Sequence, residues 1–155
     1  MTGNATAEEH ERVDEGDEPN WGTCRVPNPP PIEMPTEDVP EDELAIFSGS
    51  AQLQLDGDAS FDDDITLVSG NRLLTAQNAN FDRETNVFSG EGQVMYRDPQ
   101  TIVYADRGQL NQLSQEVHFD KAEFQLWSIP ARGKSEYIKA EKNGKLRLKK
   151  VSYTS

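Results

Sequence analysis

Residues 74–96 have the sequence LTAQNANFDRETNVFSGEGQVMY, in which runs of alternating apolar and polar residues lie on both sides of the turn-forming segment Asp82–Asn86. An alternation with a period of two residues is typical of β-strands that bury one face. Related patterns recur in the chain at Tyr104–Asn111, more faintly at Ile138–Lys142, and, for the second half, at Phe47–Leu53. Hairpins that repeat in this way bury their apolar faces by stacking, so the pattern predicts a layered, all-β architecture.

The alternation continues from Leu44 to the end of the chain, interrupted by turns rich in Gly, Asp, Asn and Pro. No stretch of ten or more residues has the period of 3.6 that is typical of an amphipathic helix. A globular jelly roll and a longer β-taco solenoid both fit this pattern. The predicted strands are Ala51–Leu55, Ile65–Ser69, Arg72–Phe81, Val87–Ser89, Gln93–Arg97, Thr101–Ala105, Gly108–Asn111, Val117–Asp120, Glu123–Trp127, Glu136–Ala140 and Lys145–Tyr153.

The first 43 residues differ from the rest in composition. Of the 28 acidic residues in the chain, 13 lie within residues 1–45 beside only two basic ones, so the net charge of −13 belongs mainly to this segment. So few apolar residues cannot offset the entropy of ordering the backbone, and the proline run Pro27–Pro35 favours an extended spacer. We therefore predict a disordered acidic and Pro-rich arm over residues 1–43 and a β-domain over residues 44–155.

Several classes of function are disfavoured. No apolar run approaches the roughly 18 residues of a membrane helix, and the net charge repels nucleic acid. The two histidines, His10 and His118, have no zinc-binding spacing, and we place His118 on the solvent face of a strand. The acidic cluster Asp56–Asp64 lacks the glycine and glutamate that a calcium-binding EF-hand loop requires. We expect no catalytic residue, metal or cofactor.

Two local features leave alternatives open. Trp21 and Cys24 are unusual in a polar arm and suggest a point of attachment; Cys24, the only cysteine, is either a free thiol, a partner-linking thiol or incidental. After Pro130 the chain carries eight basic and two acidic residues. Lysines often protect an exposed edge strand from aggregation, and the other possibility is a collar for an anionic ligand.

The order of Trp21-x-x-Cys24, a Pro-rich spacer and hairpins of the type quoted above resembles the periplasmic OstA-like domain of the lipopolysaccharide-assembly family of the Gram-negative outer membrane. The resemblance covers residues 21–155. It implies an open, V-shaped β-jelly roll with no enzymatic activity. The apolar interior would receive lipid A acyl chains from a periplasmic bridge protein of the same fold. It would then pass them to a C-terminal β-barrel plugged by a lipoprotein.

The resemblance also implies roles for individual residues. Cys24 would form a disulfide with a cysteine of the barrel region, and the last strand, Lys145–Tyr153, would lead towards that barrel. A bridge protein would add its edge strand by β-augmentation to the first strand of the domain, at Phe47, Gly49, Ala51 and Leu53. The lipid-binding interior would be lined by residues that alternate along the strands: Leu53, Leu55, Leu67, Leu74, Val94, Tyr96, Ile102, Tyr104, Val117, Phe119, Phe124, Leu126, Ile138, Leu146 and Leu148.

Relative to that family the chain lacks a signal peptide, a barrel and a second domain cysteine, so we expect an excised or truncated domain from the periplasmic face of the outer membrane. Two other classes of function remain as alternatives. A structural β-repeat scaffold or adhesin-like module would pack its interior completely and leave no trough. An enzyme acting on polysaccharide would need paired carboxylates across a cleft, and neighbouring aspartates such as Asp62 and Asp64 give no sign of that geometry.

Overall fold

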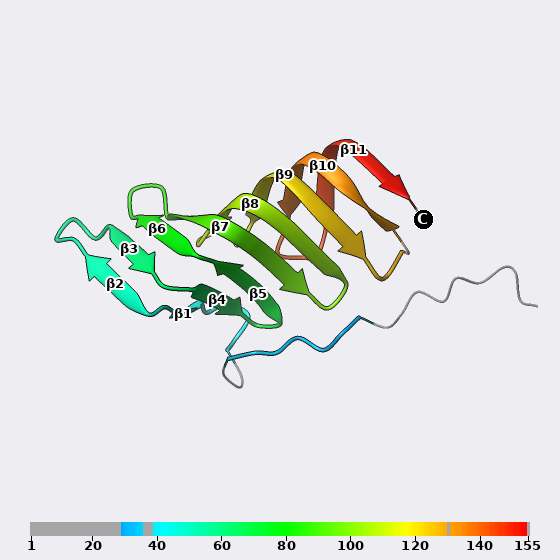
Figure 1. The fold of residues 1–155 in the computed structure, drawn as a ribbon. Helices are drawn as coiled ribbons and strands as arrows, with labels where there is room; N and C mark the ends of the chain where they lie inside the picture. Colours follow the sequence, from blue (N-terminus) through cyan, green and yellow to red (C-terminus); the bar gives the residue numbers. More distant parts are fainter. Residues whose placement is uncertain (1–28, 36–38, 130, 155) are drawn as a thin grey trace, which may run out of the picture.

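The computed structural model describes residues 29–35, 39–129 and 131–154, which form eleven β-strands joined by turns (Figure 1). In these ranges there is no helix, and so none long and apolar enough to cross a membrane. The strands are β1 (Ala45–Phe47), β2 (Ser50–Leu53), β3 (Ala59–Asp62), β4 (Ile65–Ser69), β5 (Arg72–Ala76), β6 (Asn78–Asp82), β7 (Val87–Asp98), β8 (Thr101–Asn111), β9 (Val117–Leu126), β10 (Ala131–Ala140) and β11 (Leu146–Thr154).

All eleven strands belong to one open antiparallel sheet with two halves, which we call wings. In one half the order is β1-β4-β5-β7-β8-β9-β10-β11, and in the other β2, β3 and β6 lead to the same β7. The β1 wing comprises β1, β4, β5 and residues 94–98, 101–105, 122–126, 131–135 and 151–154; the β2 wing comprises β2, β3, β6 and residues 87–91, 107–111, 117–120, 137–140 and 146–149. The long strands β7–β11 therefore run through both wings and curve between them (Figure 1).

The wings meet along a crease of irregular backbone. The β7–β8 register shifts between Glu91 and Val94, as in a β-bulge, which bends a strand and increases its twist. A left-handed backbone conformation is uncommon outside glycine. Non-glycine residues with φ between +47° and +64° nevertheless recur along this line: Asp63, Asp64, Gln93, Lys121 and Lys150. The repeated irregularity folds the sheet so that the inner faces of the wings lie opposite each other.

Ser135 satisfies backbone groups where the crease crosses β10. Its side chain is buried, and its hydroxyl lies 2.7 Å from the carbonyl oxygens of both Tyr137 and Lys149. Buried backbone groups that lose their ladder partners need another partner, and this hydroxyl supplies one. Ser135 therefore supports the bend between β10 and β11.

The crease also changes which residues face inward. In β9 the buried residues are Val117 and Phe119 on one side of it and Ala122 and Phe124 on the other. Side chains alternate strictly only within a regular strand, so the irregular residue Lys121 resets the alternation and keeps the apolar residues inside.

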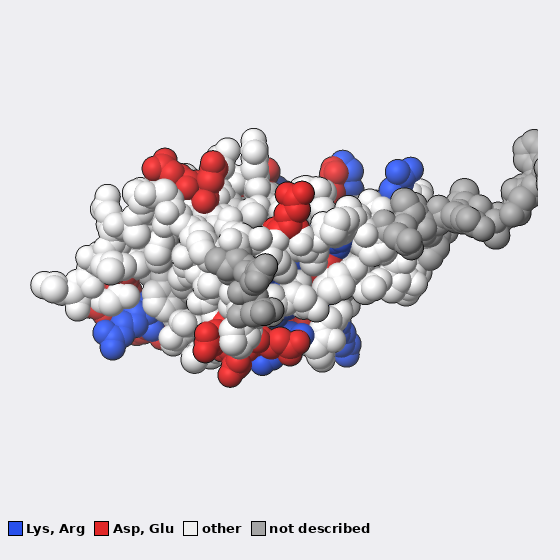
Figure 2. Space-filling model, turned by 90° about the horizontal axis from the view of Figure 1, so that it is seen from below, with Lys and Arg blue, Asp and Glu red and all other residues white. Residues whose placement is uncertain are grey.

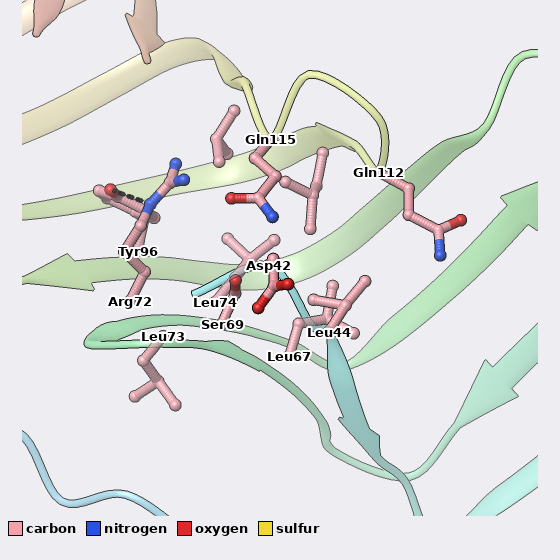
Figure 3. A pocket seen from close by; sticks show the side chains of 12 residues that line it. Asp42, Leu44, Leu67, Ser69, Arg72, Leu73, Leu74, Tyr96, Gln112 and Gln115 are labelled. Atoms are coloured by element: carbon pink, nitrogen blue, oxygen red, sulfur yellow. Dashed lines mark hydrogen bonds between the residues drawn. The ribbon is translucent and has the colours of Figure 1, made fainter. Parts of the chain in front are cut away.

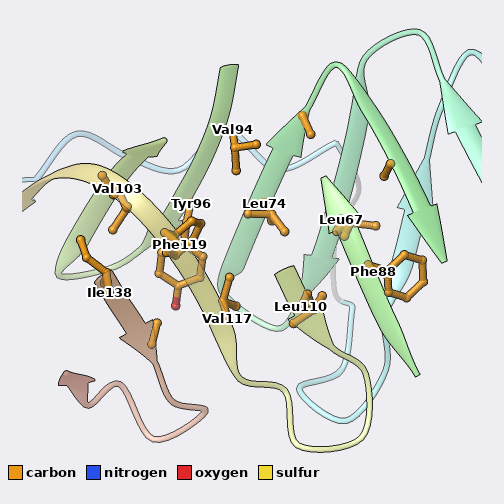
Figure 4. Close-up of a cluster of buried hydrophobic side chains, with 14 of the residues drawn as sticks. Leu67, Leu74, Phe88, Val94, Tyr96, Val103, Leu110, Val117, Phe119 and Ile138 are labelled. Carbon is orange, nitrogen blue, oxygen red and sulfur yellow. The ribbon is translucent and has the colours of Figure 1, made fainter. Parts of the chain in front are cut away.

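Apolar side chains from both wings form one continuous core (Figure 4). The rings of Tyr96, from the β1 wing, and Phe119, from the β2 wing, have centroids 5.8 Å apart. Full burial of one large apolar side chain contributes roughly 1.5–3 kcal/mol. The core consists of Ile65, Leu67, Leu74, Ala76, Ala79, Phe88, Val94, Tyr96, Val103, Leu110, Val117, Phe119, Ala122, Phe124, Ile138 and Ala140.

The all-β, open jelly-roll fold predicted from the sequence is confirmed, with local differences. Strand β4 has the predicted bounds. The predicted breaks within β7, β8 and β9 fall on the crease, where the structure has continuous strands. The predicted first strand through Phe47 and Leu53 is two strands, β1 and β2, which pair with β4 and β3 respectively. Strand β3 was not predicted, and it occupies part of the acidic cluster interpreted as a turn. The boundary between arm and domain at Leu44 stays a prediction.

Candidate functional site

The apolar interior between the wings is the candidate site. Most of the residues predicted to face inward lie there, some within the buried core and others partly buried against it (Figure 4). Leu67, Leu74, Val94, Tyr96, Val117, Phe119, Phe124 and Ile138 belong to the core, and Leu126, Leu146 and Leu148 pack against it. These residues face inward in the structure. Their role in lipid binding stays a prediction.

The inward orientation predicted for Leu53, Leu55, Ile102 and Tyr104 is wrong. Leu53 is 80% exposed in β2, which is exposed throughout and pairs with β3 alone among the described residues; Leu55 lies in the turn that follows. In β8 the side chain of Tyr104 is 52% exposed, and Ile102 lines the same shallow depression on the outer face.

The inward residue of this part of β8 is Val103, which is fully buried. Because Thr101–Ala105 is apolar on both faces, its alternation does not define the register. An error of one residue in the predicted register of this segment therefore exchanged its inner and outer faces.

A small cavity opens between the wings on the side away from the crease (Figure 3). Its volume is about 60 Å³, well below the roughly 300–1,000 Å³ of typical small-molecule sites. We call this cavity the mouth. It is lined by Asp42, Leu44, Leu67, Ser69, Arg72, Leu73, Leu74, Tyr96, Leu110, Gln112, Gln115 and Val117.

Residues 39–44 form a strap across the mouth. The carbonyl oxygen of Glu41 accepts hydrogen bonds from Ser69 Oγ of the β1 wing, at 3.1 Å, and from Gln115 Nε2 in the turn at the end of the β2 wing, at 3.0 Å. Leu44 then packs against the core. Because the strap contacts both wings, it limits their separation. This contact was not predicted, because a polar, Pro-rich segment has no apolar period that indicates docking.

Arg72 lies at the side of the mouth in a polar network. Arg72 Nε donates to Tyr96 Oη at 3.0 Å, and Tyr96 Oη donates to Asp98 Oδ2 at 3.1 Å. Burial raises the pKa of Tyr96 to about 12; the charge of Arg72 acts in the opposite direction, and that of Asp98 adds to the rise. The phenol is therefore protonated at neutral pH and holds Arg72 and Asp98 in place.

A buried arginine, Arg97, joins the arm to the tip of the β1 wing. Arg97 Nη2 donates to the carbonyl oxygen of Pro30 at 2.6 Å, and its guanidinium carbon lies 4.2 Å from the ring centroid of Trp127. Burial lowers the pKa of Arg97, which nevertheless stays charged and bonds the carbonyl oxygen of Thr101. The Pro-rich spacer is thus held against the sheet at this point.

The predicted docking edge lies on β1 and β2. Phe47 is in β1, Ala51 and Leu53 are in β2, and each strand pairs on one side only within the described residues. Gly49 joins the two strands, and a Cβ there would lie 2.5 Å from Asp63 Cβ, so a side chain would force the backbone to move. The structure leaves a backbone edge for pairing, while its use by a partner stays a prediction.

Apart from Arg97 and Asp98, the charged side chains of the described residues are exposed or only partly buried. Figure 2 shows acidic side chains in separate clusters among uncharged atoms on one face. Four of the six basic residues on β10 and β11 form ion pairs, including Lys150 with Glu136 at 2.8 Å and Arg147 with Glu141 at 2.6 Å. Hydrogen bonds from these cations lower the pKa values of Glu136 and Glu141. Such pairing favours the protected edge strand over an anion-binding collar.

Other candidate residues are not brought into a site. Asp62 and Asp64 are exposed beside the crease, and His118 is on the outer face, where Nδ1 lies 2.6 Å from Tyr137 Oη. No group of three or more His, Cys, Asp or Glu residues in residues 29–35, 39–129 and 131–154 is placed to hold a metal ion. Trp21 and Cys24, including the predicted disulfide, lie outside the described residues.

Comparison with known proteins gives one consistent set of relatives. No protein-family model matches the chain. It is 24% identical over 117 residues to the LPS-assembly protein LptD of Pseudoalteromonas atlantica, covering 76% of this chain and 15% of that protein. It is 27% identical over 121 residues to LptD of Xylella fastidiosa strain Temecula1, covering 70% of this chain and 14% of that protein. The chain thus spans about 15% of the length of the curated relatives it matches.

In fold the chain is similar to LptH of Pseudomonas aeruginosa, described as the LptA-homologous periplasmic component of a lipopolysaccharide transport device. The TM-score is 0.62 at 17% sequence identity, over 75% of this chain and 99% of LptH. With the two wings and their shared apolar interior, these similarities confirm the predicted resemblance of the chain to the OstA-like periplasmic domain of the LPS-assembly protein LptD.

Proposed function

We propose that the chain takes part in lipopolysaccharide transport as a periplasmic, non-enzymatic domain that holds lipid A acyl chains between its two wings. The observation that supports this most directly is the apolar core shared by two wings of a sheet that is not closed at the mouth. The names of the relatives, LptD and LptH, support the transported molecule and the location.

The chemistry of the cargo explains the need for such an interior. An acyl chain crossing water loses about 0.8 kcal/mol of stability for each methylene group left exposed. A trough lined by side chains such as Phe88, Val103 and Phe119 replaces water without any covalent step. Side-chain contacts of this kind are non-directional, so they also let a chain slide along the trough.

Binding in this interior requires the wings to separate. The mouth holds about 60 Å³, which is too small for an acyl chain. The crease is the natural hinge, because it is the line along which the backbone departs from a regular sheet. The strap is the contact that opening has to release first, because Glu41 is bonded to both sides.

We further propose the partners that such a domain would need. A bridge protein of the same fold would add to the β1–β2 edge by β-augmentation, and the β11 edge would lead to the barrel domain and its plug lipoprotein. Cys24 would be the disulfide partner of that barrel region. The protein would then act at the periplasmic face of the outer membrane.

Photo-crosslinking of the 155-residue chain to lipopolysaccharide tests the proposal. A photoreactive phenylalanine analogue replaces either Phe119, which is buried in the core, or Tyr104, which is 52% exposed on the outer face. Both positions hold an aromatic ring, so the two variants are matched. We expect lipopolysaccharide adducts at position 119 and few at position 104.

A scaffold without a trough is the second candidate, and the observation that favours it is the small volume of the mouth. It predicts no adduct at position 119 in a folded protein. Adducts at position 104 alone would place the lipid on the outer face. Either result would contradict the proposed trough, and circular dichroism establishes that both variants are folded.

A further inference from the structure

One polar atom at the mouth has no partner. Arg72 Nη2 is buried, and the described part of the chain offers it no hydrogen-bond acceptor. The same guanidinium is held through its Nε by Tyr96, whose hydroxyl proton goes to Asp98. In Figure 3 Arg72 lies beside the cavity with this bond to Tyr96 drawn.

A buried charged donor without an acceptor is destabilising, and native proteins satisfy nearly all such groups. The groups that a guanidinium binds best are carboxylates and phosphates, because its planar N–H groups match their oxygen atoms. The Tyr96–Asp98 pair fixes the guanidinium in advance. The donor is therefore preorganised for an oxyanion.

The surroundings of Arg72 match an amphiphilic ligand. Leu44, Leu67 and Leu110 form an apolar side of the same cavity, which continues into the core. Asp42, on the strap, is the acidic residue lining the cavity, and it would leave the mouth when the strap is displaced. Opening would therefore remove the competing negative charge and the steric obstacle together.

We propose that Arg72 binds a phosphate oxygen of the glycolipid headgroup at the mouth while the acyl chains lie between the wings. This inference rests on the proposed function and adds a headgroup contact to it. Arg72 would then be a specificity-determining residue that prefers phosphorylated lipid A to the same acylated disaccharide without phosphate. Tyr96 would act through Arg72 as a positioning residue.

A competition experiment tests this preference. The 155-residue chain is mixed with equal amounts of bisphosphorylated and dephosphorylated lipid A, and native mass spectrometry gives the ratio of the two complexes. For the natural sequence we expect the phosphorylated lipid to be favoured about tenfold or more, as for a charge-assisted hydrogen bond. Arg72→Gln should bring the ratio close to one, and Arg72→Lys should restore part of it.

Arg107→Gln is the matched control, because Arg107 is exposed, pairs with Glu91 on the surface and has the same charge. It should keep the ratio of the natural sequence. Arg72→Gln with an unchanged ratio would overturn the headgroup contact and leave the trough intact. Absence of both lipids from every folded variant would overturn the trough itself.

Inorganic phosphate separates a lipid site from a free-phosphate site. We expect millimolar phosphate to compete weakly, because it lacks the apolar contacts of the acyl chains. One result would overturn the assignment to a lipid headgroup: inorganic phosphate binds the natural chain as tightly as phosphorylated lipid A does, and it does not bind Arg72→Gln. Thermal unfolding of each variant establishes that it is folded.

Discussion

Among single residues, Tyr96 connects the apolar interior to the polar mouth. Its ring packs against Phe119 from the other wing, and its hydroxyl lies between Arg72 and Asp98. Burial is the main reason that its pKa rises to about 12. A phenolate at this position would lose solvation, so the folded chain retains the proton at a pH where an unfolded tyrosine has lost it.

This retained proton predicts a pH dependence of stability. Below pH 10 the tyrosine is protonated in both states, and its full contribution is present. Between pH 10 and 12 the unfolded chain loses the proton while the folded chain keeps it, so the free energy of unfolding falls by about 2 kcal/mol. Urea unfolding at pH 9 and pH 12 measures this loss.

Tyr96→Phe is the control for that measurement, because the other titrating groups are unchanged. The loss between pH 9 and pH 12 should be about 2 kcal/mol smaller in this variant. Equal losses in the two proteins would show that Tyr96 is not held in its protonated form by burial.

Among the strands, the crease has the clearest local signature. Gln93 has φ +47° in β7, whereas Gln109, in β8, is exposed and absent from the residues with positive φ. Glycine adopts the left-handed region without steric cost, and β-branched residues adopt it poorly. The same substitutions should therefore have opposite effects at the two glutamines.

We expect Gln93→Gly to keep or raise the free energy of unfolding and Gln93→Val to lower it by about 1–2 kcal/mol. At Gln109 we expect the valine variant to be more stable than the glycine variant, since valine suits a strand and glycine weakens it by roughly 1 kcal/mol. Chemical denaturation of the four variants gives these values. If the glycine and valine variants had the same ranking in free energy of unfolding at both positions, a left-handed conformation of Gln93 at the crease would be contradicted.

The strap predicts an effect on the rate of ligand entry. Replacing Ser69 and Gln115 together by alanine removes both hydrogen bonds to Glu41. The association rate of an apolar fluorescent probe should rise about fivefold, equivalent to roughly 1 kcal/mol. Gln112→Ala, at the same mouth, has no such bond to the strap among the described residues and should keep the original rate. A double variant with unchanged kinetics would exclude the strap as a barrier.

The strands also show how far the sequence could predict this fold. Alternation located β4 and most residues of β5–β9 and β11, because it reflects burial of one face. It wrongly joined β5 and β6 into one strand, Arg72–Phe81, and missed residues 131–135 of β10. It failed at the crease, where irregular residues such as Lys121 shift the alternation, and in β8, where Ile102, Val103 and Tyr104 are all apolar. The strap and Arg72 were missed because their contacts join segments far apart in the sequence.

In the molecule as a whole, two wings share one apolar core, and the mouth opens between them. The mouth is too small for an acyl chain, so lipid binding requires the wings to separate along the crease. The rims of the wings provide exposed positions to follow this motion: Asn71 in the β4–β5 turn, Leu113 in the β8–β9 turn and Asn143 in the β10–β11 turn.

The most direct test is the distance between spin labels at positions 71 and 113 in a Cys24→Ser chain. Pulsed electron paramagnetic resonance measures this distance with and without lipopolysaccharide. The two labels lie on different wings, so the distance should increase when lipid binds. A second pair at positions 113 and 143 lies on the β2 wing alone and should not change. Bound lipopolysaccharide with an unchanged distance between positions 71 and 113 would contradict a lipid held between the wings.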